Sequence, residues 1–92
     1  MSDKAVKISK DVIGLRSFGR LSFNAQALYF HLLLAADGEG VVHDPKAVMN
    51  RVCASDLDLE ELVYADFLTS LGESGVFIRH WTQHIGAEVD DD

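Results

Sequence analysis

The chain has 92 residues, which is the length of one small domain and leaves no room for a second. Apolar residues make up 48% of the sequence, too large a share for a disordered chain. The net charge of −7, from 15 acidic against 8 basic residues, argues against a protein that grips nucleic acid with its whole surface, although not against one with a local basic patch.

Charge is distributed unevenly along the chain. Residues 1–20 carry five bases against two acids, whereas residues 21–92 carry three bases against 13 acids. We therefore expect three parts: a basic N-terminal arm over residues 1–20, a folded domain over 21–85 and an acidic tail over 86–92.

The sequence predicts a cytoplasmic protein that does not enter the membrane. Cys53 is the only cysteine, so no internal disulfide can form, which is typical of a reducing compartment. Lysines occupy the N-terminal positions where a signal peptide would be apolar. The longest apolar stretch, residues 27–36, is interrupted by His31 and is far shorter than the roughly 20 residues of a membrane span.

In chain order, residues 1–20 mix charged and apolar positions and are compatible with an extended arm or a short helix. A helix is predicted from Phe23 to Ala36, because the run is rich in Ala, Leu and Gln and follows Ser22, a good N-terminal cap. Its buried face is expected to consist of Ala25, Leu28, Tyr29, Leu32 and Ala36, widened by Phe30, Leu33 and Leu34. Two glycines in the turn at 37–40 end this helix, and the valine pair at 41–42 predicts a short edge strand.

Two further helices are predicted next. Asp44 followed by Pro45 is typical of a helix start, and this helix has one apolar stripe of Val48, Met49 and Val52. Ser55 with Asp58 resembles a capping box that begins a third helix. The apolar side of the third helix consists of Leu59, Leu62 and Val63. Its polar side consists of Asp58, Glu60, Glu61 and Tyr64.

The last part of the chain predicts a β-hairpin, because β-favouring runs at 67–71 and 76–81 flank a glycine-containing loop at 72–75. The resulting order is helix, short strand, helix, helix, strand, strand. That is the order of a winged helix-turn-helix domain, a small α+β fold of three helices plus a β-hairpin wing.

The stretch from Leu21 to Leu32, LSFNAQALYFHL, resembles the opening helix of phage replisome organisers, which are replication-initiation proteins of phages and prophages with a winged-helix N-terminal domain. Shorter matches occur in the family's order: Ile8-Ser9-Lys10 with Val12-Ile13, Ala36-Asp37 with Gly40-Val41, Asp44-Pro45-Lys46, Ala54-Ser55 with Asp58-Leu59, Ser74-Gly75-Val76 and His80-Trp81. The resemblance covers residues 8–84 and depends on the ordered set, since no single motif is specific. It implies self-association and contacts with replication proteins.

The chain departs from the family in two places. The family continues after the His-Trp pair into a longer and often basic region, whereas residues 82–92 are acidic. The family also has Lys-Gly before the hairpin, where this chain has Ala65-Asp66. The resemblance therefore implies the family's fold more strongly than it implies the family's binding of DNA.

The predicted third helix is the one that would enter the major groove in a DNA-binding winged helix, where Arg, Lys, Asn and Gln make the base contacts. Residues 54–66 instead contain five acids and no base. Three interpretations stay open: a solvated acidic face, a negative surface that fits a basic protein groove, and direct reading of DNA. The candidate partner-binding residues are Asp56, Asp58, Glu60, Glu61, Tyr64 and Trp81.

Basic residues that could contact phosphate are few and scattered along the sequence. The candidates are Lys7, Lys10, Arg16, Arg20 and Arg79. We therefore expect weak DNA binding, and as partner a basic surface of another protein or complex; a homodimer is also compatible with the resemblance.

No pattern indicates catalysis, a metal site or a cofactor, so we expect a non-enzyme. His80 and His84 are four residues apart, but His80 falls in a predicted strand, where that spacing separates the side chains by about 13 Å. Cys53 has no base at a spacing that would activate it, and a small buried role is expected instead. His31 is expected to be a hydrogen-bonded core or boundary residue.

Three functions follow as hypotheses. The leading one is a phage or prophage protein-interaction module in DNA replication, acting in the cytoplasm of the bacterial host. The first alternative is an acidic DNA mimic that inhibits a host nucleic-acid-binding complex, of the anti-CRISPR or anti-restriction type. The second is a DNA-binding transcriptional regulator, which the fold alone would allow.

Overall fold

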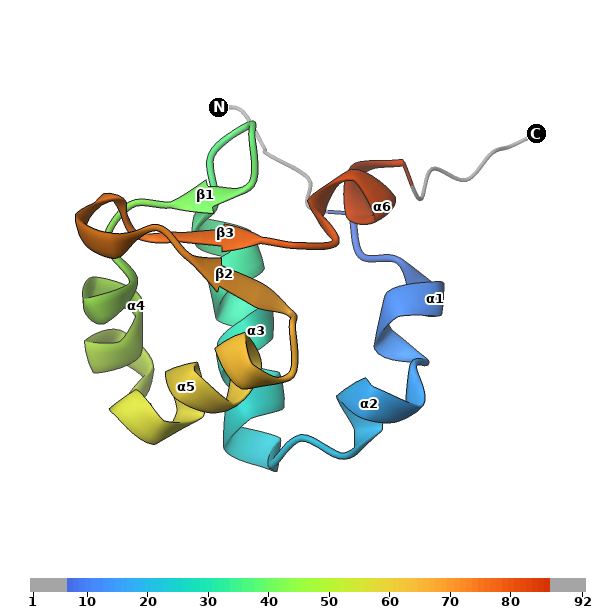
Figure 1. Ribbon diagram of the computed structural model, residues 1–92, viewed down its shortest axis with the longest axis horizontal. Coiled ribbons are helices and arrows are strands. Elements are labelled where there is room, and N and C mark those ends of the chain that lie inside the picture. Colours follow the sequence, from blue (N-terminus) through green and yellow to red (C-terminus); the bar gives the residue numbers. More distant parts are fainter. Residues whose placement is uncertain (1–6, 87–92) are drawn as a thin grey trace.

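The computed structural model describes residues 7–86, and Figure 1 traces the chain. Within this range, six α-helices pack with one three-stranded antiparallel sheet, so the protein is a small α+β domain. The helices are α1 (Lys10–Ile13), α2 (Arg16–Gly19), α3 (Phe23–Ala35), α4 (Pro45–Val52), α5 (Asp56–Tyr64) and α6 (Trp81–Ile85). The strands are β1 (Val41–Val42), β2 (Leu68–Ser70) and β3 (Val76–Ile78), and a 3-10 turn, η1 (Gly72–Ser74), joins β2 to β3.

Helix α3 is the central element of the core, and both α4 and α5 pack against it. It begins as predicted, because the Ser22 hydroxyl accepts a hydrogen bond from the Ala25 N–H at 3.1 Å. Its predicted inner face is confirmed, since Leu28, Tyr29 and Leu32 are fully buried. Leu34 was expected to widen that face but is exposed, because it lies on the solvent side of α3.

The N-terminal segment folds onto the same core. Of the two conformations compatible with its sequence, the short helix is the one found, as α1 and α2. Val12 and Phe18 are buried, and the Phe18 ring meets the rings of Tyr29 and Phe67 edge-on, with centroids 5.5 and 5.4 Å apart. This edge-to-face arrangement is the one that aromatic quadrupoles favour.

Both predicted helix starts after the first turn are confirmed. The Asp44 carboxylate accepts from the Ala47 N–H at 3.2 Å, with Pro45 at the first helical position of α4. At α5 the capping box is complete: the Ser55 hydroxyl accepts from the Asp58 N–H, and the Asp58 carboxylate accepts from the Ser55 N–H.

The expectation that Cys53 is buried is wrong, because its thiol is exposed. Cys53 ends α4 with a left-handed backbone (φ 60°), and the chain then turns so that the Ala54 N–H donates to the Met49 carbonyl at 2.9 Å. The residue therefore serves the helix end and does not fill the core.

The sheet has the order β1-β3-β2, and its inner side faces the helices. In register, Val42 pairs with Val76 and Leu68 with Ile78, and these four side chains are buried. Gly75 is required at the start of β3, because its φ is 107° and a Cβ there would overlap the Val42 carbonyl oxygen. The hairpin loop is therefore held close to β1.

The chain leaves the sheet earlier than predicted. β3 ends at Ile78, and residues expected to extend it, His80 and Trp81, instead begin α6. The reason is tertiary: α6 places His84 inside the core, where it touches α3 and the N-terminal segment.

Candidate interaction surface

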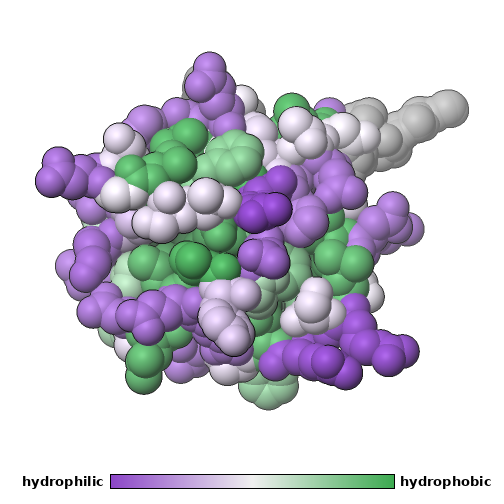
Figure 2. All heavy atoms as spheres, in the orientation of Figure 1, coloured by the Kyte–Doolittle hydropathy of each residue, from purple (hydrophilic) through white to green (hydrophobic). Residues whose placement is uncertain are grey.

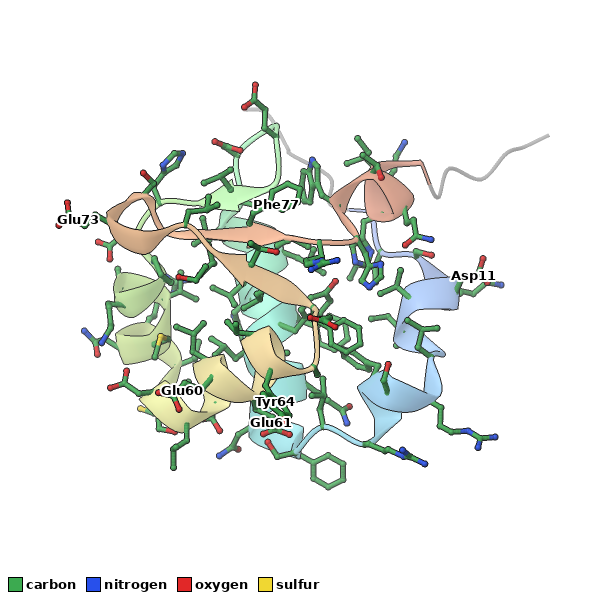
Figure 3. The ribbon with its side chains drawn as sticks, viewed as in Figure 1. Asp11, Glu60, Glu61, Tyr64, Glu73 and Phe77 are labelled. Atoms are coloured by element: carbon green, nitrogen blue, oxygen red, sulfur yellow. The ribbon has the colours of Figure 1, made fainter. Side chains whose placement is uncertain are left out.

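Helix α5 carries one outward stripe, defined here as the α5 stripe: Leu57, Glu60, Glu61 and Tyr64. Their spacing of i, i+3, i+4 and i+7 places them on one side of the helix, and Figure 3 shows the two glutamates and the tyrosine around its outer side. Leu57 is 73% and Tyr64 91% exposed. Two large apolar side chains therefore lie beside two glutamates on the solvent side of α5.

The acids of α5 are less free than the sequence implies. Asp58 is buried and serves the capping box, and Asp56 lies 3.1 Å from the Lys46 ammonium. Both Glu61 oxygens accept from Ser22, one from its N–H (2.7 Å) and one from its hydroxyl (2.8 Å). Among the described residues, Glu60 is the one α5 acid with neither a hydrogen bond nor an ion pair.

The contact between Glu61 and Ser22 brings a further apolar residue to this surface. Phe23 follows Ser22 directly, is the first residue of α3 and is 86% exposed. Sequence reasoning missed Phe23 and Leu57. Leu57 could have been found from its spacing of seven residues from Tyr64. No sequence signal pointed to Phe23, because its place near α5 depends on the tertiary contact between Ser22 and Glu61.

A groove lies between α5 and the hairpin, and we call it the α5–hairpin groove. It encloses about 330 Å³ and is lined by Leu59, Glu60, Val63, Tyr64, Ser70 and Val76. Figure 2 shows apolar atoms in the hollow between the hairpin and α5, bordered by hydrophilic atoms. A second hollow of about 310 Å³, toward the start of α4, shares the lining residues Leu59, Ser70 and Val76, so the two hollows are adjacent.

Trp81, a predicted partner-binding residue, lies apart from α5. Its indole N–H donates to the Gly38 carbonyl at 3.2 Å, and its ring covers Gly40, where a Cβ would collide with it. Trp81 is half-buried and fastens α6 to the turn before β1. We therefore leave it out of the candidate surface.

The candidate phosphate-binding residues do not gather around α5. Lys10, Arg16 and Arg20 belong to α1, α2 and its end, which Figure 1 places on the opposite side of α3 from α4, and Lys7 precedes them in the chain. Arg79 follows β3 and its guanidinium lies 3.9 Å from the Asp66 carboxylate. The structure thus places none of these bases on α5, and it places Arg79 beside an acid.

His84 is held as a neutral residue by its two partners. The Ser9 N–H donates to Nδ1 at 2.9 Å, so Nδ1 carries no proton, and the proton on Nε2 points to the Tyr29 hydroxyl 2.7 Å away. Burial, and secondarily His80, lowers the pKa of the ring below its ordinary value of 6.5.

His80 and His84 do stand at helical spacing, contrary to the strand expected there, but both ring nitrogens of His84 are engaged. No group of three or more His, Cys, Asp or Glu side chains within residues 7–86 is arranged to hold a metal ion. His31 is partly buried on α3, next to a small hollow that Cys53 and Ala54 also line.

Comparisons with known proteins return no match: no family model, no curated protein and no solved structure is similar to this chain. None of the helices in the described part of the chain has the length and apolar character of a membrane span.

Proposed function

We propose that this chain is a winged-helix protein-interaction module whose α5 stripe binds a cationic surface of another protein. The topology supports the winged-helix assignment: α3, α4 and α5 precede the β2–β3 hairpin, and β1 joins that hairpin as its third strand. In this assignment α5 takes the position of the recognition helix and η1 is the tip of the wing.

The observation that carries the proposal is the composition of the α5 stripe. Leu57 and Tyr64 expose large apolar surfaces, which mark contact sites when they cluster. Glu60 and Glu61 lie between them, and α5 has four acids and no base. A polyanion would be repelled from this helix, whereas a protein surface with Lys or Arg around an apolar centre would complement it.

The resemblance of the sequence to phage replisome organisers supports a setting in phage DNA replication, with a replication protein as the partner. Recognition of protein is favoured over recognition of DNA, because residues 54–66 contain five acids and no base.

The alternative of a nucleic-acid mimic has weaker support from the contacts of α5. Three of its four acids are engaged within the molecule, by the capping box, by Lys46 and by Ser22. A mimic of phosphates would also have no use for the exposed Leu57 and Tyr64.

The proposal is tested by capture with matched variants. The purified chain is immobilised and exposed to bacterial extract, beside Glu60→Lys, Tyr64→Ser and the control Glu39→Lys, which makes the same charge change in the exposed turn before β1. We expect a basic protein that the wild type and Glu39→Lys retain and the two α5 variants lose.

Two results would contradict the proposal. One is retention of every captured protein by both α5 variants. The other is a gel shift of short duplex DNA at nanomolar protein and physiological salt, which would mean that the domain reads DNA despite its acidic helix.

A further inference from the structure

We propose that the α5–hairpin groove receives an aliphatic side chain from the partner, on a segment in which Lys or Arg flanks that side chain. This inference rests on the proposed function and deepens it, because it specifies the chemistry of the segment that the α5 surface binds. It commits to one occupant, a cationic segment of another protein with a single apolar anchor.

The floor of the groove explains the aliphatic anchor. Leu59 and Val63 of α5 are half-buried and face Val76 of β3 across a space of about 330 Å³. The edge-strand residue Ser70 forms part of the wall but contributes only a small side chain. Leu59 and Val63 thus remain partly accessible beside the buried Val76, at the bottom of a concavity where an inserted aliphatic side chain would displace water.

The rim of the groove explains the flanking cations. Glu60 lines the groove itself, and Asp44 and Glu73 line the adjacent hollow. Within residues 7–86, Lys46 is the one Lys or Arg that lines either hollow, and its ammonium lies 3.1 Å from the Asp56 carboxylate. Negative charge therefore surrounds an apolar floor, which complements a segment with Lys or Arg on both sides of its apolar residue.

The same features exclude nucleic acid as the occupant. In the winged-helix assignment this groove lies between the recognition helix and the wing, where the DNA backbone would have to pass. Glu60 and Glu73 line this region, and among the described Lys and Arg residues only Lys46, which is paired with Asp56, lines either hollow.

The experiment is a titration of 15N-labelled protein, followed by NMR, with three synthetic hexapeptides as probes. The first has one leucine with three lysines before it and two after it, the second replaces the leucine by serine, and the third replaces the lysines by glutamates. We expect the first probe to shift resonances of Leu59, Val63, Ser70 and Val76, and to bind at least about tenfold more tightly than either of the others.

Two matched variants separate the groove from the rest of the surface. Ser70→Phe fills the groove from an exposed position, and Thr69→Phe places the same ring on the outer side of the sheet, beside Phe77. We expect about tenfold weaker binding of the first probe to Ser70→Phe and unchanged binding to Thr69→Phe.

The outcomes distinguish this inference from the proposed function. If the serine probe binds as tightly as the leucine probe and Ser70→Phe has no effect, the groove is not the anchor site, while binding of cations to α5 stands. If no lysine probe shifts any resonance of α5, both proposals are overturned. Tighter binding of the glutamate probe would also overturn both.

Discussion

The Tyr29 hydroxyl and the Nε2 atom of His84 lie 2.7 Å apart inside the protein, joining α3 to α6. The other ring nitrogen of His84 accepts from the backbone of Ser9, so one imidazole links the central helix, the last helix and the N-terminal segment. The segment from Ser9 to Phe18 covers part of the core, so these two hydrogen bonds of His84 stabilise its packing against the rest of the protein.

Replacing Tyr29 by Phe is expected to lower the free energy of unfolding by about 1–3 kcal/mol, because the buried Nε2–H of His84 loses its acceptor. The matched control is Tyr64→Phe, whose hydroxyl is at a 91% exposed residue and whose effect is expected to stay within about 0.5 kcal/mol. Urea unfolding at pH 7.5 measures both. Equal effects of the two substitutions would contradict the buried hydrogen bond.

The stability is expected to fall as the pH is lowered from 7.5 to 5.5. The pKa of His84 is lower in the folded than in the unfolded protein, so below about 6.5 the unfolded chain binds a proton that the folded chain does not. His84→Gln should reduce stability at pH 7.5 and flatten this pH dependence. If the urea midpoint of the wild type stayed constant between pH 7.5 and 5.5, the prediction would be wrong, because protonation of His84 would then not lower the free energy of unfolding.

Asp58→Ala is expected to destabilise the protein by about 1 kcal/mol, since it removes the acceptor of the Ser55 N–H and half of the capping box. Asp56→Ala removes an acid two residues away whose ion pair with Lys46 is exposed, and its effect should stay below about 0.5 kcal/mol. Thermal and urea unfolding of the two variants give the comparison. The prediction fails if Asp56→Ala is the more damaging change.

Gly75→Ala is expected to cost at least about 3 kcal/mol, because it combines a backbone conformation that alanine resists with an overlap against the Val42 carbonyl. Gly72→Ala is the control: its φ is also positive, at 66°, but no atom lies within 4 Å of the new Cβ, so about 1 kcal/mol is expected. Unfolding curves and the NMR pattern of β1 would show whether the sheet keeps its register. If both substitutions lowered the free energy of unfolding by the same amount, backbone strain alone would account for the loss, and the overlap with the Val42 carbonyl would contribute nothing.

Local signals explain the parts of the fold that the sequence predicted well. Ser22, Pro45 and the Ser55–Asp58 pair act on backbone groups within three residues of themselves, so their effect can be read without knowing the tertiary structure. The two valines of β1 likewise formed the expected edge strand.

The errors came from residues whose environment depends on distant parts of the chain. His80 and Trp81 favour strand locally, but the insertion of His84 between Ser9 and Tyr29 makes a helix the better solution. Leu34 continues an apolar run but lies on a side of α3 that the described part of the chain leaves exposed. Cys53 is apolar by type but occupies the turn at which α4 ends.

The candidate site was predicted in composition and not in geometry. The acidic character of α5 is evident in the sequence, and Glu60, Glu61 and Tyr64 do lie on one exposed side. The commitment of Asp58 to the cap, the place of Phe23 beside the Glu61 contact and the groove beneath the hairpin all require the packed structure.

The hydrogen bond between Ser9 and His84 has a practical consequence for anyone handling the molecule. It brings the first and last described segments together at one corner, which Figure 1 places away from α5. A linker joined at residue 7 or at Gly86 would leave from that corner, so the protein can be anchored to a sensor chip or fused to a reporter with its α5 stripe turned toward solution.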